Sequence, residues 1–317
     1  MILITGGGGF YGRNIARYLL DRGKEVLLLQ RSPVQVTPFL APFWDKQLKA
    51  VRGDVVNLPH LMSLIKNYNV ESIIHLALAA DRQGRKSEVP FYQVMQINLQ
   101  GTINILEAAH IFGLRRVTFA SSNTVYFGKN ELPKGLYHED LDVPVLGHWR
   151  HTTPSKKAGE QICLMYAKEY NLSVCMIRGG TGYGPGAHGA NPPDVMIPNA
   201  LEGKPVDLTH LPENSTFTPV YIKDLAKGYG LIHLADSPKH HIYNISSGNM
   251  YTFSEIARTV KEIIPKADIR LGAPSPEVVP FCPSIERAKE EFGYSPDYAD
   301  IKKGIMAYID YLRNGTY

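Results

Sequence analysis

Short apolar runs alternate with longer amphipathic stretches along the first 178 residues of the chain. The runs are rich in Val, Ile and Leu, which is typical of strands that are buried on both faces. The longer stretches repeat apolar residues every three or four positions, as a helix with one buried face does. The expected strands are Met1–Thr5, Glu25–Gln30, Ser72–Leu76, Arg116–Ala120 and Ser173–Arg178, and the expected helices are Arg13–Asp21, Leu58–Tyr68, Val94–Phe112 and Ser155–Tyr170.

This alternation predicts an α/β fold with a doubly wound parallel sheet of the Rossmann type. It stops after Arg178, where glycines and prolines between Gly179 and Pro193 indicate loops. A smaller C-terminal lobe is expected to begin there. Later stretches return to the pattern, with expected strands Val220–Ile222 and His241–Ile245 and an expected helix Phe253–Ile264.

A glycine-rich turn, Thr5-Gly6-Gly7-Gly8-Gly9-Phe10-Tyr11-Gly12, connects the first strand to the first helix. Glycine lets the backbone approach a phosphate closely, and the free N–H groups of a helix N-terminus attract anions. Such a turn at the start of a βαβ unit predicts a dinucleotide site. The residues expected to contact the cofactor here are Gly6, Gly9, Phe10, Tyr11 and Gly12.

The end of the second expected strand bears on which dinucleotide binds. A carboxylate there accepts the ribose 2′-hydroxyl in NAD enzymes, whereas an arginine meets the 2′-phosphate in NADP enzymes. This chain has Gln30-Arg31-Ser32 and no carboxylate at that point. The prediction is therefore NADP or NAD, with NADP slightly favoured through Arg31. If Arg31 is only a solvated surface charge, either cofactor binds.

Asp54 and Val55 follow the third strand and are expected beside the adenine. An alternative for Asp54 is that it caps the next helix. A cofactor site at these positions predicts that residues 1–178 form a dinucleotide-binding Rossmann domain, to which 218–245 return. Residues 179–217 and 246–317 then form a substrate-binding lobe.

The charge and the cysteine content of the sequence indicate which binding partners and which cellular compartment to expect. The 34 basic and 30 acidic residues are spread along the chain without a basic run, so no nucleic acid partner is expected. No apolar run approaches the roughly 20 residues that a membrane helix requires. Three widely spaced cysteines without a C-x-x-C motif suit a reducing compartment and predict no metal site. These cysteines are Cys163, Cys175 and Cys282. We therefore expect a cytoplasmic protein with no membrane partner.

The order of these motifs resembles that of the extended short-chain dehydrogenases/reductases, also called the NAD-dependent epimerase/dehydratase family. The resemblance covers essentially the whole chain. It is carried by the glycine turn, Gly53-Asp54, His75-Leu76-Ala77, Asn98, Ser121-Ser122-Asn123-Thr124-Val125-Tyr126, Ser155-Lys156-Lys157-Ala158-Gly159-Glu160, Arg178, Tyr183-Gly184-Pro185-Gly186, Tyr221-Ile222-Lys223-Asp224-Leu225-Ala226 and Tyr243-Asn244-Ile245.

The resemblance implies a Ser–Tyr–Lys set in which the tyrosine exchanges a proton with a substrate hydroxyl while hydride passes to or from the nicotinamide. Ser122 matches the serine and Lys156 the lysine, which also contacts the cofactor. The tyrosine position, four residues before the lysine, holds Thr152. A threonine hydroxyl is far less acidic than a phenol and is carried on a shorter side chain. The proton donor is therefore expected to be non-standard.

Candidate donors lie near Thr152. His148 and His151 carry imidazoles, a group that in general can exchange protons near neutral pH, and Tyr126 follows Ser122 closely. The alternative for both histidines is that they are solvated loop residues, which is the more common role of a lone histidine. A water held by Thr152, or the substrate itself, could also move the proton.

Further family positions are implied at the cofactor and the substrate. Leu76, Ala77 and Asn98 are expected at the cofactor, and Thr181, Tyr183, Asn199 and Phe217 at the substrate. Phe217 stands where nucleotide-sugar members commonly carry an arginine that grips the diphosphate. Dehydratase members carry an Asp-Glu pair directly after the serine, where this chain has Asn123-Thr124, so dehydration is disfavoured.

Together these residues predict an NAD(P)-dependent epimerase or oxidoreductase. Its substrate is expected to be a secondary alcohol or ketone of a sugar nucleotide or sugar-like metabolite. The alternative is a catalytically impaired dinucleotide-binding sensor or partner-binding protein that lost turnover with its tyrosine. By analogy with the family, Val94–Phe112 and Ser155–Tyr170 would form the contact of a homodimer.

Overall fold

The structure is a computed structural model of the 317-residue chain. It is described for residues 1–33, 37–79, 90–127, 136–144, 152–187, 191–276, 281–315 and 317. Within these ranges, no helix combines the length and the apolar character needed to cross a bilayer.

A seven-stranded sheet forms the centre of the molecule, with strand order β12-β7-β5-β4-β1-β2-β3. Every neighbouring pair is parallel, which confirms the predicted α/β fold of the Rossmann type. The chain order reverses between β4 and β2 on either side of β1, and ligands bind at the carboxyl ends of strands at such a switch point. The strands are β1 (Ile2–Thr5), β2 (Val26–Gln30), β3 (Leu48–Arg52), β4 (Ser72–His75), β5 (Arg116–Ala120), β7 (Val174–Gly179) and β12 (Ile242–Ile245).

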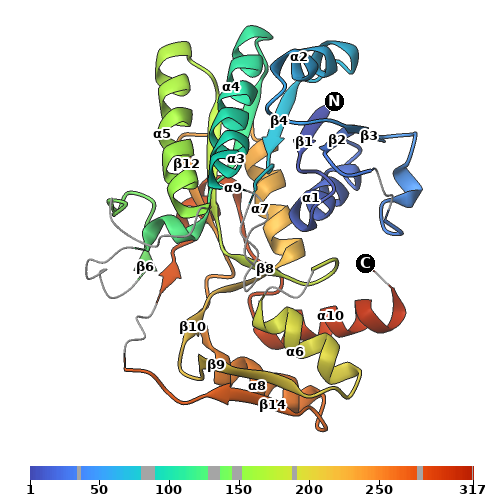
Figure 1. Cartoon of the computed structure of the whole chain (residues 1–317), viewed down its shortest axis with the longest axis vertical. Coiled ribbons are helices and arrows are strands. Elements are labelled where there is room, and N and C mark those ends of the chain that lie inside the picture. Colours follow the sequence, from blue (N-terminus) through green and yellow to red (C-terminus); the bar gives the residue numbers. More distant parts are fainter. Residues whose placement is uncertain are drawn as a thin grey trace.

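Helices cover both faces of this sheet (Figure 1). On one face α1 (Phe10–Leu20) packs against α7 (Ile222–Leu234), and on the other α4 (Gly101–Ile111) lies between α2 (Leu58–Asn67) and α5 (Thr152–Tyr170). Strand β1 feeds both layers, because Ile2 and Ile4 join the core under α1 whereas Leu3 joins the opposite core. This alternation is the two-residue period of a strand buried on both faces.

A smaller lobe lies below the sheet in Figure 1 and has its own apolar core between helices and short strands. Residues 179–217 contribute four of its elements and 246–317 most of the rest, while the exact domain boundaries remain a prediction. The helices of the lobe are α6 (Pro192–Leu201), α8 (Phe253–Ile263) and α10 (Ile301–Asn314), whereas α9 (Glu286–Phe292) packs against α7 and β12 of the central domain. The short strands outside the central sheet are β6 (Leu136–Tyr137), β8 (Thr181–Tyr183), β9 (Val206–Pro212), β10 (Thr216–Phe217), β11 (Pro219–Tyr221), β13 (Tyr251–Thr252), β14 (Ile269–Gly272) and β15 (Cys282–Pro283).

Several predicted boundaries of helices and strands were wrong. The helix expected over Val94–Phe112 begins earlier, as α3 (Phe91–Met95), and passes through a π-helical turn (Gln96–Gln100) before α4. Ile222, expected to end a strand, is the first residue of α7, and β11 pairs with β8 rather than with the central sheet. Short 3₁₀ turns at Ala41–Phe43 and Asn123–Tyr126 were not anticipated.

His233 joins α7 to the middle of the sheet. Its Nε2 lies 2.9 Å from Ser72 Oγ on β4, and its Nδ1 lies 2.8 Å from Thr118 Oγ1 on β5. The ring is fully buried, and burial lowers its pKa to about 3. Folding therefore requires the neutral imidazole, which the two hydroxyls satisfy.

A neutral buried histidine makes stability depend on pH. The unfolded chain takes up a proton below the ordinary histidine pKa and the folded chain does not, so His233 stabilises the fold at neutral pH and this contribution is lost as pH falls. Asp194 and Asp224 act in the opposite sense, because burial raises their pKa values to about 7 and about 6. Comparing the stability of the wild type with that of a His233 variant isolates the contribution of this histidine.

We expect the stability advantage of the wild type over His233→Gln to shrink by about 1–2 kcal/mol from about pH 7.5 to about pH 5. Glutamine cannot take up this proton, so its stability lacks this contribution. Urea unfolding at several pH values measures the difference, and the exposed His210→Gln serves as control. An advantage that stays constant with pH would show that His233 takes up its proton equally in the folded and the unfolded chain.

Candidate functional site

The glycine turn brings the end of β1 against the start of α1. Gly6 has a φ of +67°, which favours glycine. A β-carbon on Gly12 would lie 2.7 Å from the carbonyl oxygen of Gly6, so any side chain there would push the helix off the turn. Gly9 is the N-cap of α1 and offers no side-chain acceptor, so the first N–H groups of the helix remain available.

The turn is open on its outer side. A β-carbon on Gly9 would meet only the carbonyl oxygen of Gly6, at 3.1 Å, within 4 Å. Helix N–H groups that face open space suit a diphosphate. Phe10 and Tyr11 supply two of these N–H groups, while the Tyr11 hydroxyl accepts a 2.9 Å hydrogen bond from the Gly182 N–H of β8. The fit of this turn to a dinucleotide therefore rests on backbone groups and space.

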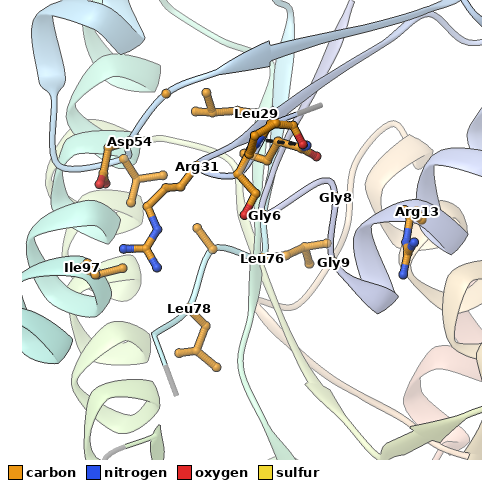
Figure 2. Close-up of a pocket in the computed structure, with 16 residues that line it drawn as sticks. Gly6, Gly8, Gly9, Arg13, Leu29, Arg31, Asp54, Leu76, Leu78 and Ile97 are labelled. Atoms are coloured by element: carbon orange, nitrogen blue, oxygen red, sulfur yellow. Dashed lines mark hydrogen bonds between the residues drawn. The ribbon is translucent and has the colours of Figure 1, made fainter. Parts of the chain in front are cut away.

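A cavity of about 680 Å³ extends from the glycine turn across the ends of β2, β3 and β4. Figure 2 shows the Arg31 guanidinium extending into this cavity toward Ile97, with Asp54 above it in the view. Arg52 donates from Nε to the Arg31 carbonyl oxygen at 3.0 Å, so a second cationic residue adjoins that end. The cavity is lined by Gly6, Gly8, Gly9, Arg13, Leu29, Gln30, Arg31, Ser32, Pro33, Gly53, Asp54, Val55, Leu76, Ala77, Leu78 and Ile97.

Asp54 lies at the cavity and does not cap α2. Its Oδ1 accepts a 3.1 Å hydrogen bond from the Val56 N–H, whereas Asn57 is the N-cap and accepts from the His60 N–H at 3.0 Å. The capping alternative for Asp54 was therefore wrong. Val55 is buried, and its carbonyl oxygen accepts from Asn104 Nδ2 at 2.9 Å.

His75, at the end of β4, links the glycine turn to the opposite helical layer. Its Nδ1 lies 2.7 Å from Thr5 Oγ1, and its Nε2 lies 3.2 Å from Thr102 Oγ1. The Thr102 hydroxyl donates to the Asn98 carbonyl oxygen, so it accepts from His75 Nε2–H and leaves Nδ1 to accept from Thr5. Burial lowers the His75 pKa to about 3, which keeps this imidazole neutral.

Asn98 continues the same chain of hydrogen bonds. Its Oδ1 accepts from the Ala79 N–H at 2.8 Å, and its Nδ2 donates to the Ala79 carbonyl oxygen and to Ser155 Oγ. The Ser155 hydroxyl in turn donates to the carbonyl oxygen of Thr152. The Asn98 side chain, which was predicted to contact the cofactor, thus holds together the segment after β4 and the start of α5.

Ser122, Thr152 and Lys156 are positioned near the carboxyl end of β5. Ser122 begins the 3₁₀ turn after that strand and accepts from the Thr124 N–H at 3.2 Å. Lys156 lies one turn into α5, packs 4.9 Å from the Phe119 ring centre and donates to the Ala120 carbonyl oxygen. Burial lowers the pKa of Lys156 to about 8. Thr152 is the first residue of the helix.

The candidate proton donors are placed differently. His148 and His151 lie outside the described residues. The Tyr126 hydroxyl donates to Asn244 Oδ1 at 2.9 Å, and the Arg178 guanidinium lies 4.8 Å from the centre of its ring. Burial raises the Tyr126 pKa. A buried phenol bonded to a neighbouring strand supports the sheet and is poorly placed for proton exchange.

A buried ion pair, not anticipated from sequence, supports the turn that carries Ser122. Arg178 Nη2 lies 2.8 Å from Glu160 Oε2, and both side chains are almost fully buried. The Ser121 hydroxyl donates to Glu160 Oε1 at 2.5 Å. The available signal was Glu160 itself, a charged residue on the same helical face as Lys156. Because Arg178 is committed to Glu160, it is not free to hold a substrate phosphate.

The residues predicted at the substrate lie in the lobe and in its connection to the sheet. Phe217 pairs with Tyr251 across β10 and β13, and its ring centre lies 5.9 Å from that of Phe253. Asn199 Nδ2 donates to the Val195 carbonyl oxygen within α6. Tyr183 is buried against Tyr221, and Thr181 lies half-buried at the start of β8.

Comparisons with known proteins agree with this geometry. The model of the NAD dependent epimerase/dehydratase family matches residues 2–246. The UDP-glucuronate 4-epimerase of Thermodesulfobacterium geofontis is 27% identical over 98% of this chain and 95% of its own. The UDP-glucose 4-epimerase of Thermus thermophilus, solved with NAD, has a TM-score of 0.81 at 25% identity over 99% of both chains.

A further solved structure supports the fold. MoeE5 in complex with UDP-glucuronic acid and NAD has a TM-score of 0.82 at 24% identity, with 99% of each chain covered. The Thermodesulfobacterium and Thermus proteins are named as epimerases, which agrees with the resemblance carried by the motifs. The chain belongs to the NAD-dependent epimerase/dehydratase family.

Proposed function

We propose that this protein is an NAD(P)-dependent epimerase or oxidoreductase that acts on a secondary alcohol or ketone of a sugar nucleotide or sugar-like metabolite. The observation that carries the proposal is the arrangement at the switch point of the sheet. An open glycine turn and a cavity of about 680 Å³ lie at β1 and β2, and Ser122 and Lys156 lie two strands away at the end of β5.

Each residue has a distinct part in this proposal. A bound nicotinamide supplies a hydride acceptor or donor. The glycine turn holds the diphosphate through N–H groups, and the buried ammonium of Lys156 exchanges its bond to Ala120 for the nicotinamide ribose. The Ser122 hydroxyl binds the reacting oxygen. Because Thr152 lacks a phenol, His148, His151, a water held by Thr152 or the substrate itself moves the proton.

The relatives favour a sugar nucleotide as substrate, since their names specify UDP-glucuronate and UDP-glucose. The groups that bind the diphosphate of such a substrate must differ from the arginine that is common in nucleotide-sugar enzymes. Phe217 stands at that position, Arg178 pairs with Glu160, and Arg287 lies 2.5 Å from Asp140. Arg150 lies outside the described residues. We propose that backbone and neutral polar groups hold the diphosphate.

Turnover distinguishes the enzyme from the alternative of a dinucleotide-binding sensor. Purified protein loaded with NAD or NADP is offered UDP-glucose, UDP-glucuronate, dTDP-glucose and free sugars, and products are followed by chromatography and by absorbance of the reduced nicotinamide. We expect conversion of at least one sugar nucleotide. Cofactor binding without any conversion, together with activity created by Thr152→Tyr, would favour the sensor.

In the active protein, Lys156→Ala is expected to lower both cofactor affinity and turnover, whereas Thr152→Ala changes turnover little. The reason is that Lys156 binds the cofactor while proton transfer is carried by another group, whose loss typically costs about 10²–10⁴-fold in rate. Lys168→Ala, at an exposed position of the same helix, is the control. A loss of that size in Thr152→Ala would instead make the threonine the residue that holds the catalytic water or substrate.

We propose a preference for NADP over NAD. Arg31 extends into the cavity with Arg52 beside it, and no carboxylate follows β2 to accept a 2′-hydroxyl. Arg31→Asp is expected to weaken NADP binding by about tenfold to a hundredfold, the loss of one charge-assisted contact, with a smaller effect on NAD. Titration calorimetry with both cofactors measures this, with exposed Arg313→Asp as control. Equal wild-type affinities would exclude Arg31 from the choice of cofactor.

We propose that the protein is a homodimer through α4 and α5. Large apolar side chains are exposed on these helices and their ends, with Met165 51% exposed and Ile111 51% exposed. Sedimentation is expected to show two chains per particle, and Met165→Glu to shift the protein toward monomer. Met306→Glu on α10, where the side chain is 55% exposed, is the matched control. A monomeric wild type would contradict the proposal.

We also propose a cytoplasmic location. Cys163, Cys175 and Cys282 are free thiols in the structure, which suits a reducing compartment.

A further inference from the structure

Three hydroxyl groups form a short hydrogen-bonded chain that ends at Ser122. Thr153 Oγ1, near the start of α5, donates to Thr124 Oγ1 at 3.1 Å. Thr124 Oγ1 donates to Ser122 Oγ at 3.0 Å. The backbone N–H of Thr124 also donates to Ser122 Oγ, at 3.2 Å. Thr153 is buried, while Ser122 and Thr124 are half-buried.

The order of donors decides what Ser122 can do. A serine hydroxyl has two acceptor lone pairs and one hydrogen. The N–H of Thr124 can only donate, so it occupies one lone pair, and the Thr124 hydroxyl occupies the other. The Ser122 hydrogen is then the group left for a ligand. We propose that Thr124 and Thr153 are positioning residues that make Ser122 a dedicated hydrogen-bond donor to the reacting oxygen of the substrate.

The neighbouring serine shows the contrast. Ser121 donates its hydrogen to Glu160 Oε1, inside the buried pair with Arg178. Of the two adjacent serines, Ser121 therefore donates its hydrogen to a buried carboxylate, whereas the Ser122 oxygen accepts two hydrogen bonds from Thr124. Because Ser122 is half-buried, its hydrogen can reach a bound molecule.

The arrangement also defines when Ser122 acts. A donor whose own oxygen accepts two hydrogen bonds is polarised by them, and it binds a negatively charged oxygen better than a neutral one. Ser122 keeps its proton throughout, and the proton of the substrate hydroxyl moves to the separate donor discussed above. The hydroxyl chain should thus lower the barrier of the chemical step and contribute little to binding of the ground state.

This inference rests on the proposed function, and the expected kinetics are specific. Thr124→Val keeps the shape and removes the hydroxyl, so kcat should fall by about tenfold, the effect of one net hydrogen bond, while KM and cofactor affinity stay within about twofold. Thr124→Ser restores the hydroxyl and should restore kcat. Thr153→Val acts one bond further away and should have a smaller effect. Exposed Thr209→Val is the control.

A double variant separates positioning from a structural role. If Thr124 acts through Ser122, adding Thr124→Val to Ser122→Ala should cost no further activity. Additive losses, or a loss that Thr124→Ser fails to restore, would overturn the proposal. Melting temperatures of all variants are measured alongside, and a low kcat explained by unfolding at the assay temperature would likewise count against it.

Neutron diffraction of deuterium-exchanged crystals tests the donor order without turnover. Deuterium on Thr124 Oγ1 should point at Ser122 Oγ, and deuterium on Thr153 Oγ1 at Thr124. The opposite order, with Ser122 donating to Thr124, would overturn the inference even in an active enzyme. Absence of turnover with every sugar nucleotide would instead overturn the proposed function and its catalytic consequence, while the deuterium positions would still decide the donor order.

Discussion

The site depends on one hydrogen-bonded chain that passes through the neutral ring of His75. It begins at Thr5, where β1 enters the glycine turn, and continues through Thr102 and Asn98 to Ser155 at the start of α5. Burial keeps the imidazole neutral, so its Nδ1 accepts from Thr5 and its Nε2–H donates to Thr102. The chain fixes the cofactor turn and the helix of Lys156 relative to each other, although they come from distant parts of the sequence.

Around these hydrogen bonds, some polar side chains are bonded to one another and others can still contact a ligand. Glu160 and Arg178 neutralise each other inside the core, and Tyr126 is bound to Asn244, so none of the three is free for a ligand. Ser122, Lys156 and Arg31 keep a group that a bound molecule can use. Although Thr152 lacks a phenol, Ser122 and Lys156 keep hydrogen-bond partners within the described residues.

The glycine turn and the parallel sheet were predictable because they follow local rules, whereas Ser122 and Lys156 were proposed from the family resemblance. Strand and helix periods are visible over a few residues, and glycine is required where the backbone turns tightly. The role of Asn98 and the capping alternative for Asp54 were not decided by such rules. Asn57, three residues further on, offers the same chemistry as Asp54 and occupies the cap.

By itself, the amino-acid order determined the fold class, the dinucleotide turn and the absence of a tyrosine before Lys156, since each is a property of neighbouring residues. Only the tertiary structure decided which polar groups are already satisfied. The partners of His75, Glu160 and Ser122 come from other elements, and a buried group is free or committed according to what packs against it. That is why Arg178, known from the sequence only as a family motif residue, forms an internal ion pair in the folded chain. It is also why the contact of Thr153 with Thr124 is visible only where the start of α5 packs against the turn after β5.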